Sequence, residues 1–353
     1  MINSGVVMKK FMWFGLPALI VFALIVFKVT DTIWSEGREA GANGLRLESA
    51  DQGDRKGYKF PRFYKGFYLT TEAGANMKKL EPFIEKAKAA GLNTVVLDVQ
   101  NSRFSECMVP AENIEYLVKN GFHPIARVVV FPDGLKSFPV PEAAIQDKIA
   151  LAENACKNGF KEIQFDYIRF NDFGVLRQLT LQQKYDFIQG FLARAKKSLE
   201  KYDVKIAADI FGRIPLNKQD EIGQNMEVFD KVVDVICPMA YPSHYTWSMD
   251  LMSNPYQTVF ITSKRARERV KNADIVTYIQ AFKYKHDLSK LTFEKYIEEQ
   301  IRGVHDSEVR GYLLWNARHE YDTAFDVVKE YYSKEASRVS KVSNRNKAES
   351  SSI

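Results

Sequence analysis

The sequence predicts an α/β fold, a single (β/α)8 barrel of the TIM type, and three observations support this. From residue 63 onward, short apolar segments alternate with amphipathic segments of helical period, and this occurs eight times over about 270 residues. Such alternation implies parallel strands joined by right-handed crossovers. No G-x-G-x-x-G motif follows the first strand, which disfavours an open dinucleotide-binding sheet.

The eight predicted strands are rich in Val, Ile, Leu, Phe and Tyr, and each is followed by a predicted helix. Several of the helices end at a glycine, such as Gly91, Gly121 and Gly159. The strands are expected at residues 66–70, 94–100, 124–130, 162–170, 205–211, 233–241, 275–282 and 311–317. The helices are expected at residues 77–90, 111–120, 141–158, 180–201, 224–230, 255–271, 292–305 and 322–333.

Four segments are predicted: a signal anchor or transmembrane helix at 1–30, a linker at 31–62, the barrel at 63–334 and a disordered polar tail at 335–353. Residues 11–27 form an uncharged apolar run behind Lys9 and Lys10. This pattern favours a membrane anchor with the barrel outside the cytoplasm, periplasmic or extracellular. If the segment is cleaved as a signal peptide, the protein is secreted.

Charge and cysteine content exclude some classes of function. The net charge is +6, but residues 31–334 carry only +1, so the sequence predicts no nucleic-acid partner. The three cysteines have no metal-like spacing and form no disulfide framework. The scattered histidines show no ligand motif, so we expect neither a metal nor another cofactor.

Polar side chains fall at the carboxyl ends of the predicted strands, where this fold places active sites. Asp166 and Asp209 lie near the ends of the neighbouring fourth and fifth strands, and Asp98 lies near the end of the second. A buried carboxylate is costly unless it is paired or used, so three acids at one rim indicate a site. Further polar and aromatic residues at this rim are Arg127, Arg169, Tyr241, His244, Gln280, Trp315 and Asn316.

These residue types together are typical of a carbohydrate site. Carboxylates supply the acid, base or nucleophile, amides and arginines bind hydroxyls, and aromatic rings stack on sugars. Asp166 and Asp209 are the candidate catalytic pair, with Asp166 as nucleophile or general base and Asp209 as general acid, or with the two roles exchanged. Their separation would decide between a retaining and an inverting reaction.

Five stretches resemble, in order, the signatures of the glycoside hydrolase family called the DUF4015 domain. They are 165–170 (FDYIRF), 208–212 (ADIFG), 222–224 (IGQ), 237–245 (CPMAYPSHY) and 314–316 (LWN). The resemblance covers about residues 63–333 and implies a TIM barrel that hydrolyses a polysaccharide or oligosaccharide. It also adds Gln224 to the residues expected to bind substrate. The sequence departs from the family at Asn171, where proline is usual, and at Gln100-Asn101, where Lys-Asp is usual.

Other interpretations stay open at this point. Asp166 could form an ion pair with Arg169 or Arg127, although Arg169 is an odd number of residues away along the strand. Asp209 could cap the following turn. Trp315 could be a sugar platform or barrel packing. The missing second acid after Asp98 would suit a non-catalytic glycan-binding or cell-envelope organising barrel, whereas a metal-dependent deacetylase would lack its histidine ligands.

Overall fold

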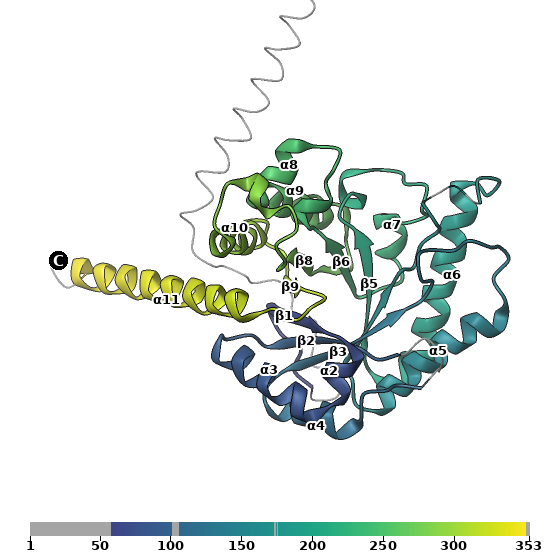
Figure 1. The fold of residues 1–353 in the computed structure, drawn as a ribbon, viewed down its shortest axis with the longest axis horizontal. Helices are drawn as coiled ribbons and strands as arrows, with labels where there is room; N and C mark the ends of the chain where they lie inside the picture. The colour runs from purple at the N-terminus through teal and green to yellow at the C-terminus, as the bar shows by residue number, and fades with distance from the viewer. Residues whose placement is uncertain (1–57, 101–105, 173, 175, 351–353) are drawn as a thin grey trace, which may run out of the picture. The chain divides into compact units, whose positions relative to one another are not determined.

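The computed structural model describes residues 58–100, 106–172, 174 and 176–350. Eight parallel strand positions close into a barrel, with helices outside it (Figure 1). Strand β1 pairs with β2 on one side and with β9 on the other, and the β5–β6 pairing completes the closure. The strands are β1 (Tyr64–Leu69), β2 (Thr94–Asp98), β3 (His123–Val129), β4 (Glu162–Asp166), β5 (Lys205–Phe211), β6 (Val235–Met239), β7 (Asp274–Ile275), β8 (Thr277–Gln280) and β9 (Gly311–Trp315). This confirms the predicted barrel.

The seventh strand position is shared by β7 and β8, which are separated by Val276 and both pair with β6. The α-helices are α2 (Thr71–Ala75), α3 (Met77–Ala89), α4 (Ala111–Lys119), α5 (Glu142–Lys157), α6 (Leu181–Leu199), α7 (Met226–Phe229), α8 (Met249–Ser253), α9 (Pro255–Arg269), α10 (Phe293–Asp306) and α11 (Asp322–Ser350). Short 3-10 helices are η2 (Glu200–Tyr202), η3 (Ile214–Leu216), η4 (Pro242–His244) and η5 (His286–Ser289). Polar caps start several helices, as where Thr180 and Gln183 form a capping box on α6.

Side chains of each strand alternate between the helices and the barrel interior. On β4, Ile163 and Phe165 join the large apolar core between strands and helices. Glu162, Gln164 and Asp166 take the alternate positions. Glu162 and Gln164 have partners on β1 and β8 across the interior, and Asp166 has its partner on the adjacent β3. The interior of this barrel therefore contains a polar column, and the outer layer supplies most of the apolar packing.

The column has three levels. At the bottom, Glu162 accepts hydrogen bonds from Tyr64 (3.0 Å) and pairs with His123 (3.0 Å). In the middle, Gln164 accepts from the Tyr278 hydroxyl at 2.7 Å. At the top, Asp166 pairs with Arg127. The upper level is the one at the carboxyl ends of the strands, so the site is built there.

The structure differs from the sequence prediction at two segment boundaries. Strand β4 ends at Asp166 because Tyr167 adopts a left-handed backbone conformation, with φ of 55°. The second difference is at the end of the predicted linker, 31–62. Tyr58 belongs to that segment, yet its hydroxyl hydrogen-bonds His123 at the bottom of the barrel (3.0 Å), so contacts with the barrel begin before residue 63.

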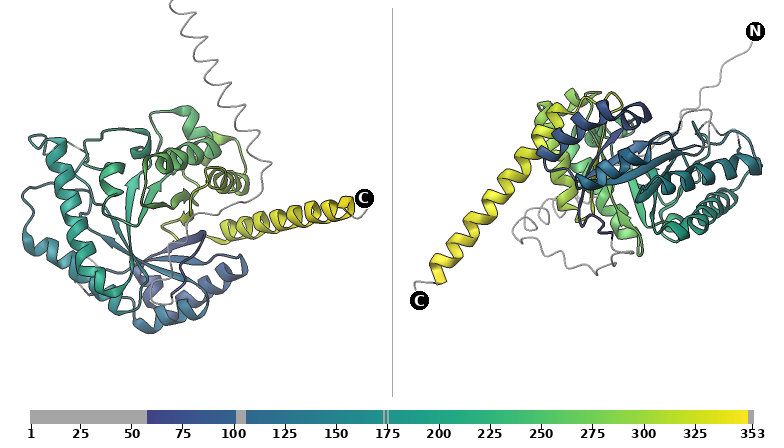
Figure 2. Two further views of the ribbon diagram at one scale, coloured as in Figure 1. Left: turned by 180° about the vertical axis from the view of Figure 1, so that it is seen from behind. Right: turned by 90° about the horizontal axis from the view of Figure 1, so that it is seen from below.

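The predicted disordered tail is also helical in the structure as far as Ser350. Helix α11 continues to that residue and extends away from the strands (Figure 2). No Gly or Pro interrupts residues 322–350, so nothing in the backbone chemistry ends the helix earlier.

The predicted membrane anchor at residues 1–30 lies outside the described residues and stays a prediction. Within the part of the chain that the structure describes, no helix has the length and apolar character needed to cross a membrane.

Candidate active site

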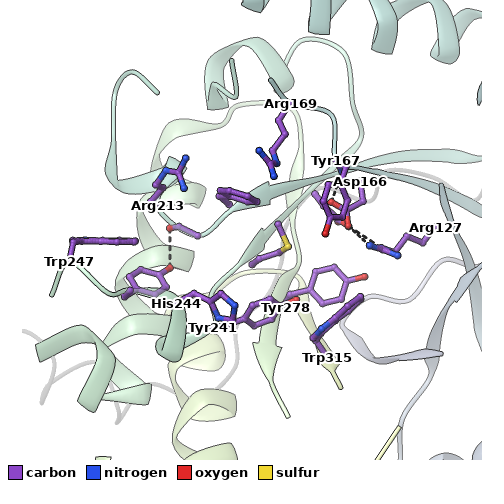
Figure 3. A pocket seen from close by; sticks show the side chains of 15 residues that line it. Arg127, Asp166, Tyr167, Arg169, Arg213, Tyr241, His244, Trp247, Tyr278 and Trp315 are labelled. Atoms are coloured by element: carbon purple, nitrogen blue, oxygen red, sulfur yellow. Dashed lines mark hydrogen bonds and ion pairs between the residues drawn. The ribbon is translucent and has the colours of Figure 1, made fainter. Parts of the chain in front are cut away.

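A pocket of about 370 Å³ opens at the carboxyl ends of the strands (Figure 3). Strands β3 to β6, β8 and β9, or the loops after them, all contribute to it, which matches the usual position of active sites in this fold. Its lining residues are Arg127, Asp166, Tyr167, Arg169, Asp209, Phe211, Gly212, Arg213, Met239, Tyr241, His244, Tyr245, Trp247, Tyr278 and Trp315. The two predicted catalytic acids thus meet in one cavity.

Asp166 is a buried carboxylate held by donors on both oxygens. Its Oδ2 accepts hydrogen bonds from Arg127 Nε (3.0 Å) and Nη2 (2.5 Å). Its Oδ1 accepts from the backbone N–H of Tyr167 at 2.6 Å. Tyr167 itself adopts a left-handed conformation, which is costly for a residue with a large side chain and marks the point where the chain turns away from the strand. Asp166 is therefore a carboxyl group with a fixed orientation at the wall of the pocket.

Asp209 has a different environment on the neighbouring strand. Its side chain is 1% exposed, and Oδ1 has no hydrogen-bond partner among the described residues. Burial raises the pKa of this carboxyl well above its ordinary value, the charge of Asp166 raises it further, and Arg127 opposes the rise. Asp209 consequently keeps its proton over a wider pH range than an exposed aspartate. Two acids with such different surroundings are the arrangement that separates an acid from a base or nucleophile.

Arg127 connects the second, third and fourth strands. Besides its two bonds to Asp166, its Nη1 donates to Asp98 at 2.5 Å. Asp98 also accepts a short hydrogen bond from the Tyr68 hydroxyl (2.5 Å). The ring of Trp315 stacks on Tyr68 with centroids 4.0 Å apart, and the Arg127 guanidinium lies 5.1 Å from the Trp315 ring centre. This network holds Arg127 in place, and Arg127 in turn fixes the position of Asp166.

Tyr245 and Gly212 fix the backbone where β5 leaves the barrel. The Tyr245 hydroxyl donates to the Gly212 carbonyl at 3.0 Å. A Cβ at Gly212 would overlap that hydroxyl, so the close approach requires glycine. Gln224 supports the same segment, because it accepts from the Phe211 N–H (2.9 Å) and donates to the Asp209 carbonyl (3.1 Å).

Most of the predicted site residues line the pocket. Asp166, Asp209, Arg127, Arg169, Tyr241, His244 and Trp315 do so. Asp98 contacts the site through Arg127.

Gln280 and Asn316 are buried and hold the backbone of the rim loops. Gln280 accepts from the Ser243 N–H at 3.1 Å and donates to the carbonyls of Phe282 (2.9 Å) and Tyr284 (2.8 Å). Asn316 donates to the Ala281 carbonyl at 2.7 Å. Like Gln224, neither of them is among the described residues that line the pocket, so these side chains shape the site without facing it.

Several lining residues were not predicted from the sequence. They are Tyr167, Phe211, Gly212, Arg213, Met239, Tyr245, Trp247 and Tyr278. Parity on β5 and β8 places Phe211 with Asp209 and Tyr278 with Gln280, so a strict reading of alternation would have found these two. Arg213 and Trp247 lie in loops, and no periodic signal predicts where such side chains point. Among the described residues, no group of three or more His, Cys, Asp or Glu side chains is placed to hold a metal ion.

Comparison with known protein families shows which family this chain belongs to. Residues 139–321 match the DUF4015 family, which is described as "Putative glycosyl hydrolase domain". The chain belongs to this family. The matched range holds β4 to β9, and so both Asp166 and Asp209, whereas Asp98 and Arg127 precede it. The predicted family resemblance is thus confirmed, and the chain carries a glycosyl hydrolase-like domain. A comparison with curated proteins found no significant match.

Three solved structures with similar folds are described as a glycoside hydrolase domain, a chitinase and a mannanase. The glycoside hydrolase domain of PgaB (BpsB) from Bordetella bronchiseptica is 12% identical, with 76% of this chain and 98% of that chain covered and a TM-score of 0.57. A chitinase from Chromobacterium violaceum is 14% identical, with 76% of this chain and 99% of that chain covered and a TM-score of 0.53. The endo-1,4-beta-mannanase from Rhizomucor miehei is 8% identical, with 82% of this chain and 97% of that chain covered and a TM-score of 0.58. At these identities the likeness of this DUF4015 member to each of them shows the barrel fold alone.

Proposed function

We propose that this protein is a glycoside hydrolase that cleaves a polysaccharide with Asp209 as general acid and Asp166 as its ionised partner. The observation that carries the proposal is the pairing of two unlike carboxyls in one open pocket. Asp209 is buried, protonated over a wide pH range and has an unpartnered oxygen, while Asp166 is held as an anion by Arg127. Membership of the DUF4015 family supports it as well.

In this mechanism Asp209 gives its proton to the glycosidic oxygen as the bond to the anomeric carbon breaks. Asp166 faces the positive charge that develops on the sugar ring. It acts there either by attacking the anomeric carbon directly or by taking a proton from the attacking water. The anomeric configuration of the first product, followed by NMR, distinguishes these two courses.

The test is cleavage of a panel of polysaccharides, scored by the release of reducing ends. We expect Asp209→Asn and Asp166→Asn each to lower kcat by at least about 10³-fold, and azide to restore part of the rate of one of them. Asp147→Asn, which changes an exposed aspartate on α5 that does not line the pocket, is the matched control. Asp209→Asn and Asp166→Asn proteins that cleave as fast as wild type would sink the proposal.

A second candidate function is a glycan-binding barrel without turnover. The observation that favours it is Arg127, which bridges the carboxylates of Asp98 and Asp166 and so satisfies both of them structurally. The same panel separates the two functions. A binding protein migrates more slowly in affinity electrophoresis through a gel that contains its polysaccharide, but it releases no reducing ends from any polysaccharide of the panel.

We also propose that residues 11–27 anchor the chain in a membrane, with the barrel on the outer side. The support is the uncharged apolar run and the two lysines before it. Labelling of a cysteine introduced at exposed Ser333 by a membrane-impermeant thiol reagent, in intact cells, tests this. Labelling only after lysis would contradict it.

A further inference from the structure

Three cations lie in or near the pocket, and we call them the cationic rim: Arg169, Arg213 and Lys285. Arg169 follows β4 and Arg213 follows β5, and both line the pocket. Figure 3 shows both side chains on the side of the pocket away from Trp315, with the Arg169 guanidinium directed into the cavity. Lys285 lies in the loop after β8, beside pocket-lining His244, whose pKa is lowered by burial and by the charge of this lysine.

Arg169 is the most informative member of the rim. It is 7% exposed, and its guanidinium lies 4.7 Å from the ring centre of Phe211. Its Nη1 donates to the Phe170 carbonyl (3.1 Å) and to Asp172 (2.9 Å). Its buried Nε has no acceptor among the described residues. A buried N–H without an acceptor is costly, so a ligand oxygen that reached it would be bound strongly.

Among the described residues, the carboxylates that pair with the cationic rim are fewer than its three cations. Asp172 is shared between Arg169 and Arg213 (3.1 Å to the latter), and Asp220 pairs with Arg213 at 2.7 Å. The Nζ of Lys285 lies 4.0 Å from the Met252 sulfur, and no carboxylate pairs with it among the described residues. The two arginines therefore share two carboxylates, and Lys285 has none of its own among the described residues.

The opposite side of the pocket has the reverse balance. There Arg127 is shared by Asp98 and Asp166, so one cation faces two anions. A sugar ring that carried a negative substituent would be oriented by this polarity, with the substituent at the cationic rim and the anomeric carbon near Asp166. A neutral sugar would gain nothing from the separation of charge.

We propose that the cationic rim binds a carboxylate carried by the glycan, so that the substrate class is an acidic polysaccharide built with uronic acid residues. The inference rests on the proposed function, because it places the glycan in the same pocket. A planar carboxylate is the acceptor that an arginine binds most strongly, through paired N–H groups. The exposed aromatic ring of Trp247, at the same end of the pocket, gives the sugar a stacking surface.

The test compares native polyuronates with their carboxyl-reduced forms, which keep the linkages and replace each carboxylate by a neutral CH2OH. The full-length chain with Asp209→Asn binds each polymer without cleaving it, and calorimetry gives Kd. The probes are oligogalacturonate, oligomannuronate and hyaluronan oligosaccharides. We expect one native polymer to bind about 10- to 100-fold tighter than its reduced form.

The variants are made in the same Asp209→Asn background. Arg169→Gln and Lys285→Gln should each shrink the native-to-reduced ratio by at least about fivefold. Lys285 is half-buried and makes no ion pair among the described residues, so its variant is expected to fold even if Arg169→Gln does not. Lys197→Gln, an equal change of charge on the exposed side of α6, should leave the ratio unchanged.

Three results would overturn the inference: equal binding of native and reduced polymers, equal loss with Lys197→Gln, or no binding of any native polymer. Cleavage assays with the wild-type protein keep the two proposals apart. Tight binding of a native polyuronate without release of reducing ends would contradict hydrolysis and leave the acidic ligand standing. Cleavage of a neutral polysaccharide with no preference for the acidic form would contradict the acidic ligand and leave hydrolysis standing.

Discussion

Asp209→Asn is expected to abolish cleavage and to make the protein progressively more stable than wild type as the pH rises above about 4. The folded protein raises the pKa of Asp209 through burial and the charge of Asp166. An aspartate in the unfolded chain has a pKa of about 3.9. Between these two values the folded protein holds a proton that the unfolded chain has lost. Wild-type stability therefore falls as pH rises through this window.

The slope follows from one proton. Each pH unit in the window costs the wild-type protein about 1.4 kcal/mol of unfolding free energy, and asparagine, which does not ionise, avoids this cost. Below about pH 4 both states of wild type are protonated, so the difference between the two proteins becomes constant. The buried amide adds a fixed offset, which makes the slope, not the absolute difference, the quantity to compare.

The assay is denaturant unfolding of both proteins at intervals between about pH 4 and pH 8, and Asp230→Asn is the control of opposite sign. Burial acts to raise the pKa of Asp230, but hydrogen bonds from the backbone of residues 271–273 outweigh it and lower the pKa. Its contribution is present above the unfolded pKa and lost as pH falls, so this variant loses stability at neutral pH. A difference between Asp209→Asn and wild type that does not change with pH would refute the reasoning.

Three further predictions concern the residues around the acids. Arg127→Met leaves Asp166 buried without its cation and should lower the unfolding free energy by about 3–5 kcal/mol; a loss below about 1 kcal/mol in denaturant unfolding would contradict this. Gly212→Ala should destabilise by about 1–3 kcal/mol, seen as a lower Tm, because its Cβ overlaps Tyr245. Trp247→Ala removes a side chain that is 56% exposed, so KM should rise about 2- to 10-fold while Tm stays unchanged; equal KM values would exclude a stacking role.

The barrel and the meeting of Asp166 with Asp209 in one pocket were predictable because both depend on period and order. Eight alternations of strand and helix allow few topologies, and acids near the ends of neighbouring parallel strands must meet at one rim. Asp166 and Asp209 line one pocket for that reason. The raised pKa of Asp209 was not predictable, since it depends on how deeply the carboxyl is buried and on the neighbouring charge of Asp166.

The positions of the loop residues could not be predicted from the sequence, and the reason is physical. The partner of Arg169 is Asp172, three residues on, because the turn at Tyr167 ends the strand and redirects the chain. Alternation indicated that Arg169 and Asp166 point apart, but nothing in a strand pattern gives the path of a loop. The three buried amides, Gln224, Gln280 and Asn316, show the converse. Their positions at the rim were predicted, yet each is turned toward backbone groups that need a partner.

The polar column on β4 has a consequence for how this chain avoids misfolded states. A slip of β4 by one residue would turn Glu162, Gln164 and Asp166 toward the apolar outer layer, and Ile163 and Phe165 toward the interior. Every one of the hydrogen bonds and ion pairs at the three levels would be lost at once, and two acids would be buried without partners. The polar residues that support the site therefore also destabilise a shifted register of β4. Replacing them by apolar residues is expected to increase aggregation during folding before it changes the shape of the native barrel.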